Sequence, residues 1–363
     1  MYDIAIIGAG PAGATLARLL GEKYRVLLLE RRPLNVPPIP EKPGKCCGGL
    51  LSANAQQALS EMGLAVPRTI MAQEQPQQVY LIDADNGITG THARPYINCH
   101  RELLDRWLLS LVPGAVDVRC GAAFNSATAT EGGVEICYST GTGRQTAQAR
   151  MLVGADGANS QVRRQCFPRE KTPRKYVAVQ GWYEMAEMLN EHVAIFDRTV
   201  TDFYGWAIPK DGLLAIGAAF TPHADPHAHF ASLLAQLRSY GITPGKLRWR
   251  EGAMLERPLH NGQILTGNDR VALIGEAAGW ISPSTAEGFS YAFRSAQALA
   301  AALEPGLGNA TARYAANTQP LRHAITREIL KCTPMFTPWL RSIALRARPT
   351  GQVTPRFGVS AQS

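Results

Sequence analysis

The hydrophobic pattern of the first 30 residues predicts a strand, a turn, a helix and a second strand. Residues 4–7 form a short apolar run rich in β-branched side chains, which is too short for a helix and typical of a buried parallel strand. Residues 14–20 follow with helical periodicity, and residues 24–29 form another apolar run that ends at Glu30. This order predicts the first strand–helix–strand unit of a parallel α/β sheet.

Two later apolar runs have the same buried-strand character. Residues 151–153 lead into Gly154-Ala155-Asp156-Gly157, and residues 271–274 lead into Gly275-Glu276-Ala277-Ala278-Gly279. A long helix is expected from about residue 287 to residue 303. Two further helices are predicted over residues 53–62, with Ser52 as the N-cap, and over residues 99–111.

The remaining blocks have a strand pattern. Residues 77–97 carry an Asn86-Gly87 hairpin turn, residues 115–150 predict more strands, and residues 176–255 are rich in strands. We therefore expect an α/β protein with a Rossmann-like dinucleotide domain, an inserted antiparallel-sheet substrate domain and a C-terminal helical segment. The expected limits are residues 1–75, 98–170 and 256–310 for the first domain, 76–97 and 171–255 for the second, and 311–363 for the third.

Composition excludes several classes. The chain has 363 residues, 45% hydrophobic and 18% charged, which is ordinary for a globular enzyme. The net charge is +8, but the basic residues are mostly scattered and no nucleic-acid motif is present, so no nucleic-acid partner is expected. Seven cysteines form no metal or disulfide framework. The first predicted strand begins at residue 3, which leaves no room for a signal peptide, and we expect a cytoplasmic protein.

One basic segment, residues 321–356, admits two interpretations. Its arginines and lysine alternate with apolar and aromatic side chains, a pattern that can bind the surface of an anionic membrane. Pro334 and Pro338 are expected to interrupt a long amphipathic helix, which favours a C-terminal helix packed on the body of the protein. A peripheral membrane contact remains the alternative.

The turn after the first strand reads Gly8-x-Gly10-x-x-Gly13. The first glycine permits a tight turn, the second lets the backbone approach a pyrophosphate, and the third lets the helix pack closely on the sheet. The helix N-terminus then favours the phosphate charge. Glu30 follows Gly13 by 17 residues, near the spacing at which an acid bonds the ribose hydroxyls. The segment therefore predicts a dinucleotide site.

Together, the three glycine-bearing strand ends resemble the FAD fingerprints of the aromatic-hydroxylase flavoproteins, which have the glutathione-reductase fold. The resemblance implies FAD as the bound nucleotide, with Arg101 near its pyrophosphate, Asp156 and Gly157 near the flavin, and Glu276, where the family usually has aspartate, on the ribityl chain. It also implies a helix near Gly288 whose positive end points at the flavin. The remaining implied cofactor contacts are Pro11, Ala12, Arg31, Cys47, Gly48, Gly279 and Phe289.

Two stretches narrow the resemblance. Cys47-Gly48-Gly49 is similar to the Cys-Gly-Gly segment of the geranylgeranyl reductase family, and residues 204–210 are similar to its Tyr-x-Trp-x-Phe-Pro-Lys motif, with Ile208 in place of phenylalanine. Those enzymes reduce isolated C=C bonds of prenyl chains. The resemblance makes Cys47, Tyr204 and Trp206 candidate catalytic residues, although packing roles are an equal alternative for each.

The sequence thus predicts an FAD-dependent oxidoreductase that saturates an apolar, isoprenoid-like substrate. An FAD-dependent monooxygenase acting on a small aromatic or lipid substrate is the main alternative, and a non-catalytic flavin-binding sensor is a further one. The chain has no second glycine-rich nucleotide motif. NADPH, NADH or ferredoxin would therefore act as a transient electron donor.

Overall fold

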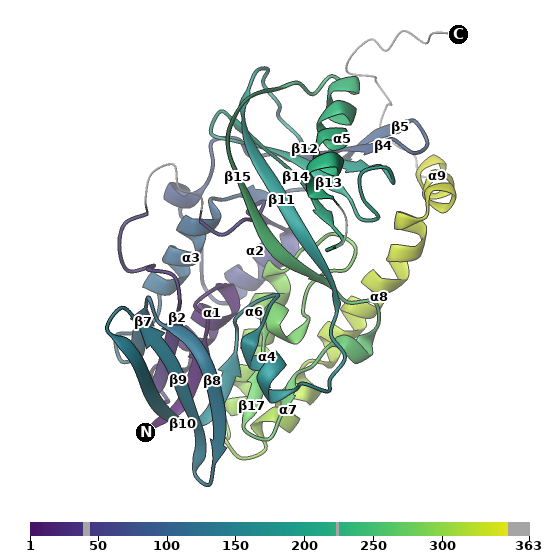
Figure 1. Cartoon of the computed structure of the whole chain (residues 1–363). Helices are drawn as coiled ribbons and strands as arrows, with labels where there is room; N and C mark the ends of the chain where they lie inside the picture. The colour runs from purple at the N-terminus through teal and green to yellow at the C-terminus, as the bar shows by residue number, and fades with distance from the viewer. Residues whose placement is uncertain (39–43, 223–224, 348–363) are drawn as a thin grey trace, which may run out of the picture.

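A computed structural model describes residues 1–38, 44–222 and 225–347 of the chain. Two large sheets dominate it, one in the lower half of Figure 1 and one in the upper half, and the C-terminal helices run along one side of both. The expected α/β fold with an antiparallel second sheet and a helical C-terminal segment is confirmed. Part of the proline-rich loop after Glu30, residues 39–43, and the end of the basic segment, residues 348–363, lie outside the described ranges.

The lower sheet is the nucleotide-binding type of sheet predicted from the sequence. Its central strands β17, β10, β1, β2 and β7 are all parallel, because each is paired with its neighbour in parallel register. The antiparallel strand β16 closes one edge. In this order the strands are β16 (Gly267–Asn268), β17 (Val271–Leu273), β10 (Gly143–Gly154), β1 (Tyr2–Ile7), β2 (Val26–Glu30) and β7 (Asp117–Cys120).

This strand order explains why the three glycine motifs act together. Strands β17, β10 and β1 are neighbours, and each ends at one of the motifs. Their carboxyl ends therefore lie at the same edge of the sheet, which is where ligands bind in open α/β sheets.

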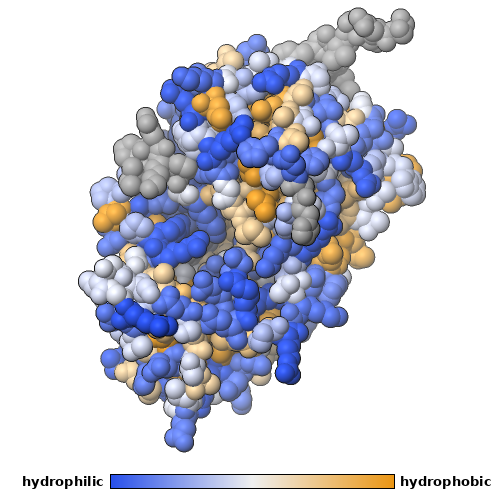
Figure 2. Space-filling view, in the orientation of Figure 1, coloured by the Kyte–Doolittle hydropathy of each residue, from blue (hydrophilic) through white to orange (hydrophobic). Residues whose placement is uncertain are grey.

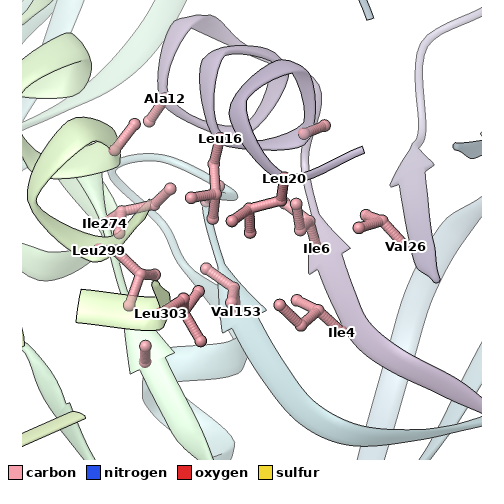
Figure 3. Packing of buried hydrophobic residues seen from close by; sticks show 14 of the residues in the cluster. Ile4, Ile6, Ala12, Leu16, Leu20, Val26, Val153, Ile274, Leu299 and Leu303 are labelled. Carbon is pink, nitrogen blue, oxygen red and sulfur yellow. The ribbon is translucent and has the colours of Figure 1, made fainter. Parts of the chain in front are cut away.

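Helices cover one face of the lower sheet. They are α1 (Pro11–Leu20), α6 (Phe289–Leu303) and α7 (Ala310–Asn317), and α3 (Arg101–Ser110) packs against α1. Figure 3 shows Leu16 and Leu20 of α1 directed onto Ile6 and Val153 of the sheet, with Leu299 of α6 beside them. These side chains are almost wholly buried, so the apolar periodicity of α1 and α6 provides this half of the core.

The opposite face is covered by an antiparallel extension and a short helix. Strands β8 (Ala123–Thr130) and β9 (Gly133–Thr140) continue the long strand β10 as an antiparallel meander, within the block where the sequence predicts strands. Helix α4 (Gln161–Cys166) packs beside them. Phe124, Ile136 and Tyr138 bury against Leu152 here, so both faces of the central strands are apolar, as expected for parallel strands.

The upper sheet has seven strands. Their order is β15 (Pro244–Arg257), β11 (Arg174–Met185), β14 (Leu213–Phe220), β13 (Gly205–Lys210), β12 (His192–Phe196), β4 (Gln78–Asp83) and β5 (Ile88–Ala93). The predicted hairpin β4–β5 completes this sheet, as expected, but β4 joins β12 in parallel, so the sheet is not wholly antiparallel. Helix α5 (Pro226–Ser239) covers one face through Phe230, Leu233 and Leu237.

Short elements join the two sheets. Helix α2 (Ala53–Glu61) begins where predicted, with Ser52 Oγ accepting the Ala55 N–H at 3.2 Å. Strands β3 (Leu50–Leu51) and β6 (Ile97–Asn98) form a two-stranded sheet. The described residues also include three 3-10 helices: η1 (Arg68–Ile70) beside α3, η2 (Asn261–Gln263) beside α8, and η3 (Gly275–Ala278) beside α6.

The C-terminal segment corrects one expectation. Helix α8 (Gln319–Phe336) continues through Pro334, and the interruption falls at Thr337, before α9 (Pro338–Arg346). Pro334 removes one N–H from the helical ladder, but α8 ends only two residues later, at Phe336, so little of the helix lies beyond it. Figure 2 shows a group of apolar side chains at the surface over α8, within a face that is otherwise mostly hydrophilic. In the described ranges, no helix is long and apolar enough to cross a bilayer.

Candidate cofactor and substrate site

The first glycine turn is built so that it excludes side chains. Gly8 has φ +101°, and a Cβ there would lie 2.6 Å from the Ala155 carbonyl oxygen. A Cβ on Gly13 would lie 1.8 Å from the Gly8 carbonyl oxygen. Ala12 packs against the third motif, since a Cβ on Gly275 would lie 2.9 Å from the Ala12 Cβ. The three strand ends are therefore in direct contact.

The N-terminus of α1 has no side-chain cap. Gly10 is its N-cap and Pro11 its first residue, and no side-chain oxygen accepts the first N–H groups. Uncapped N–H groups with the positive end of the helix dipole form an anion site. The three predicted residues Gly10, Pro11 and Ala12 thus lie at this site.

Glu30 lies at the end of β2, beside the turn, and is buried. Its Oε2 accepts the Ala9 N–H at 2.8 Å, and its Oε1 accepts the Arg32 backbone N–H at 2.9 Å and Arg32 Nε at 3.0 Å. Arg31, which the sequence proposed as a cofactor contact, is exposed, and its neighbour Arg32 is the residue paired with Glu30. The sequence could not choose between two adjacent arginines in a loop.

Arg101 begins α3 and faces the glycine turn. A Cβ on Gly10 would lie 3.9 Å from its Nη2. Burial disfavours its charge, but Asp105 outweighs burial and raises the pKa of Arg101. Its Nε donates to Asp105 at 2.7 Å, and its Cζ lies 5.1 Å from the centre of the Phe289 ring. This fixes the guanidinium beside the anion site.

Asp105 was not identified from the sequence, although it is fully buried. It accepts from Arg101 and, at 2.8 Å, from Arg32. Burial alone would raise its pKa, but these two guanidinium groups outweigh burial and lower the pKa of Asp105. An acid four residues after Arg101, on a helix whose other buried positions are leucines, is the signal that could have revealed it.

Lys45 is a second residue that the sequence analysis missed. A Cβ on Gly157 would lie 3.6 Å from its Nζ, so the ammonium reaches the second glycine motif. Lys45 is exposed, and the positive charge of the nearby Arg101 guanidinium lowers its pKa. Two cations that repel each other at one edge of the sheet indicate a site for an anion.

Asp156 has a local structural partner. Its Oδ1 accepts from Ser160 Oγ at 2.6 Å, and its Oδ2 accepts the Gln161 and Val162 N–H groups at 2.6 and 3.2 Å. The carboxylate therefore caps α4, and Gly157, at φ +79°, turns the chain beside it.

The third motif brings two carboxyl groups together. Glu276 Oε1 accepts the Glu256 N–H at 3.2 Å. Burial, reinforced by Glu276, raises the pKa of Glu256 to about 8. Burial also raises the pKa of Glu276, against the effect of Lys45 and Arg101. Gly279, at φ +89°, ends this turn.

Helix α6 begins after Gly288, and Phe289 is its first residue. Its N-terminus differs from that of α1, because Glu287 accepts the Ser290 N–H at 2.7 Å and Ser290 Oγ at 2.5 Å. Part of the positive end that the resemblance directs at the flavin is therefore occupied by a carboxylate from the chain itself.

These residues fit a bound FAD. The uncapped N-terminus of α1, with Arg101 and Lys45 beside it, has the donors and charge that a diphosphate requires. Glu30 lies beside the glycine turn, where the motif places the adenosine ribose, and Glu276 interacts electrostatically with both cations.

Cys47 and Gly48 lie between this cofactor site, which is called the cradle below, and the upper sheet. Cys47 is half-buried, packs against the cluster formed by α1, α2, α3 and α6, and interacts electrostatically with Arg101. A Cβ on Gly48 would lie 2.6 Å from Ile208 Cδ1, and Lys210 Nζ donates to the Gly48 carbonyl at 3.0 Å. Lys210 is buried, and burial lowers its pKa to about 8.

Tyr204 and Trp206 lie on the aromatic side of the upper sheet, in a cluster with Phe203, Tyr176 and Phe336. Tyr204 Oη donates to the Thr285 carbonyl at 2.6 Å, and its ring centre lies 6.0 Å from that of Trp206. Burial raises the pKa of Tyr204. The fold brings both residues to the side of the sheet that carries Ile208.

The chain matches the model of a family described as FAD binding domain over residues 1–185. Protein CbrA of Escherichia coli O9:H4 (strain HS) is 35% identical over 346 residues, which cover 95% of this chain and 93% of that protein. The match to the family model supports FAD as the cofactor.

Two solved structures share the fold. A geranylgeranyl bacteriochlorophyll reductase-like protein from Thermoplasma acidophilum has a TM-score of 0.82 at 17% identity, covering 99% of this chain and 94% of that one. PqsL, a probable FAD-dependent monooxygenase from Pseudomonas aeruginosa, has a TM-score of 0.69 at 20% identity, covering 95% and 99%. The family model, the relative CbrA and the residues at the three strand ends together show that the chain belongs to the FAD-binding domain family.

Proposed function

We propose that this protein is an FAD-dependent reductase that saturates a C=C bond of an apolar, isoprenoid-like substrate. The observation that carries the proposal is the contact between two segments more than 150 residues apart in sequence. Gly48 packs against Ile208, and Lys210 bonds the Gly48 carbonyl. These are the two segments that resemble the geranylgeranyl reductase family.

An alkene offers no charge to bind, so affinity must come from apolar and aromatic surface. Tyr204 and Trp206, which are half-buried, provide such a surface on the upper sheet, and the buried Ile208 next to them packs against Gly48. Phe203 lies behind them and is almost fully buried, so it supports the Tyr204 ring rather than facing a substrate.

Reduced FAD supplies a hydride to one alkene carbon, and a proton must reach the other. Cys47 is suited to positioning, because its Sγ accepts the Gly49 N–H at 3.4 Å and holds the loop against Arg101. Lys210 fixes the same loop from the substrate side. NADPH, NADH or ferredoxin is the proposed source of electrons.

A monooxygenase is the alternative, and the likeness of the whole fold to PqsL favours it. The same cradle would then bind FAD for O2 activation, and the aromatic surface would bind an aromatic or lipid substrate. A flavin-binding sensor would bind FAD without turning over either substrate.

Anaerobic single turnover separates these functions. The FAD-loaded protein is reduced chemically, freed of O2 and mixed with a polyprenyl alcohol, and flavin absorption is followed. The reductase predicts reoxidation that depends on the alkene, with a saturated product by mass spectrometry. Reoxidation only after O2 is admitted, with a hydroxylated product, would establish the monooxygenase. Reoxidation by O2 without a saturated or hydroxylated product would favour the non-catalytic flavin-binding sensor.

A further inference from the structure

A hydrogen-bonded chain of polar side chains crosses the aromatic side of the upper sheet. Trp206 Nε1 donates to Gln180 Oε1 at 2.9 Å, and Gln180 Nε2 donates to Glu251 Oε1 at 2.8 Å. Trp182 Nε1 donates to the same carboxylate oxygen at 3.0 Å. Gln180 is fully buried. An indole N–H can only donate, so it fixes the orientation of the Gln180 amide and directs its NH₂ group at Glu251.

The register of four strands places these hydrogen-bonded side chains next to one another. Gln180 of β11 is opposite Glu251 of β15 on one side and Gly217 of β14 on the other, and Gly217 is opposite Trp206 of β13. A Cβ on Gly217 would lie 2.5 Å from Trp206 Cζ2, so only glycine lets the indole cross β14 to reach Gln180. Burying polar side chains costs free energy that a core of apolar side chains at the same positions would avoid.

The hydrogen bonds from Gln180 and Trp182 leave one carboxylate oxygen of Glu251 available. Both donors bind Oε1, and among the residues that the structure describes no donor reaches Oε2 of this half-buried side chain. Trp182 is itself held by stacking on Trp249, with ring centres 5.3 Å apart. Glu251 is thus fixed in place with a free oxygen.

Glu251 lies near the loop that joins the two halves of the site. It interacts electrostatically with Cys46, next to Cys47, and with Lys210, which bonds the Gly48 carbonyl. Burial raises the pKa of Glu251, although Trp182, Gln180 and Lys210 oppose the shift. Among the described residues, Cys46 of the loop and Lys210 of β13 are titratable groups that interact with Glu251.

We propose that Glu251 is the proton donor of the reaction, delivering the proton on Oε2 to the alkene carbon that does not receive the hydride. This inference rests on the proposed reductase function. In the step, the Oε2–H bond breaks and its electron pair stays on the carboxylate, while the alkene π pair forms the new C–H bond. The other carbon takes the hydride from reduced FAD, so the alkene is reduced by two electrons and FAD is oxidised by two. Glu251 then regains a proton from solvent.

The test compares the wild-type protein with Glu251→Gln, Glu251→Asp and the control Glu187→Gln, an exposed position in the same half of the molecule. Gln at 251 keeps an oxygen that can accept from Trp182 and Gln180, so FAD binding and the melting temperature should stay at wild-type values. In the anaerobic turnover of a polyprenyl alcohol, we expect Glu251→Gln to slow alkene-dependent reoxidation at least about 100-fold, with Glu251→Asp partly active. The wild-type rate should fall as pH rises, and the residual rate of Glu251→Gln should not.

A second readout needs neither cofactor nor substrate. Because Trp182 donates to Glu251, its fluorescence should titrate with the carboxyl group above the usual glutamate range, and the transition should vanish in Glu251→Gln only. A Glu251→Gln variant that folds, binds FAD and reoxidises at the wild-type rate would overturn the proposal. If the wild-type protein shows no alkene-dependent reoxidation, the reductase function fails and the proton-donor role fails with it. In that case, a persisting fluorescence transition would show that the Trp182–Glu251 contact itself is correctly placed.

Discussion

At Gly13 there is no space for even one methyl group, since a Cβ would lie 1.8 Å from a backbone oxygen. We therefore expect Gly13→Ala to separate α1 from the turn, lowering the free energy of unfolding by about 3 kcal/mol and abolishing FAD uptake. Urea unfolding and flavin absorbance measure both effects. Gly132→Ala is the matched control, because a Cβ at Gly132 meets no atom within 4 Å. Equal behaviour of the two variants would contradict the packing described for the glycine turn.

Glu256 makes stability depend on pH. Its carboxyl keeps its proton in the folded protein up to about pH 8, whereas in the unfolded chain it loses the proton near its ordinary value of 4.5. Between these values the folded state binds more protons, so this contribution is present at low pH and is lost as pH rises through 8. Glu256→Gln should therefore gain stability over the wild type as pH increases from 5 to 8, by at most about 1.4 kcal/mol per pH unit.

Thermal unfolding at several pH values, with and without FAD, provides the measurement. The exposed Glu187→Gln should follow the wild type throughout. A difference between Glu256→Gln and the wild type that stays constant from pH 5 to pH 8 would show that the Glu256 carboxyl is not protonated in the folded protein.

The residues that the sequence could predict are those with a fixed spacing. The glycines of the first turn and Arg101 lie around one edge of the sheet as expected. Asp105 was missed although its spacing from Arg101 on α3 offered a signal. Lys45 could not be predicted, because its role depends on charges that only the fold brings together. Glu251 was missed for the same reason, since its partners are on other strands.

At the scale of elements, helix α9 is attached by one buried arginine. Arg341 Nη2 contacts Asp83 at 2.7 Å and Asp85 at 2.6 Å, next to the turn of the β4–β5 hairpin. Asp83 is fully buried, so removing Arg341 would leave its carboxylate with the Asn86 amide but without an opposite charge. We expect Arg341→Met to lower the free energy of unfolding by about 3–5 kcal/mol, measured with urea. Arg346→Met, at an exposed position of the same helix, should change it little.

The local hydrophobic pattern predicts most helices and strands, but it does not predict how they pair and pack. Hydrophobic periodicity predicts α1, α6 and the strands around each glycine motif, because those segments bury one or both faces. The parallel pairing of β4 with β12 joins residues more than 100 positions apart, and no local signal specifies it. The sequence predicts interruptions at both Pro334 and Pro338, but α8 continues past Pro334 to Phe336 and only Pro338 begins a new helix.

At the scale of the whole molecule, the C-terminal helices present apolar side chains to solvent. Leu330, Trp339 and Ile343 are each more than half exposed, and Lys331 and Arg346 lie among them. We propose that this surface contacts an anionic membrane, from which a lipid substrate would be taken. Co-sedimentation with anionic vesicles should fall when salt is raised and, several-fold, in Trp339→Ser. Met188→Ser, at an exposed apolar residue in the loop between β11 and β12, should bind vesicles like the wild type. Wild-type binding by Trp339→Ser would exclude this surface as the membrane contact.

The central claim is that the three glycine-bearing strand ends, with Arg101 and Lys45 beside them, bind one FAD. The direct measurement is titration of the purified protein with FAD, followed by flavin absorbance and by mass spectrometry of the intact complex. The account predicts a saturable yellow complex of one FAD per chain, weakened in Arg101→Met and absent in Gly13→Ala. A protein that remains colourless in excess FAD, or that binds it equally well after Gly13→Ala, would contradict the claim.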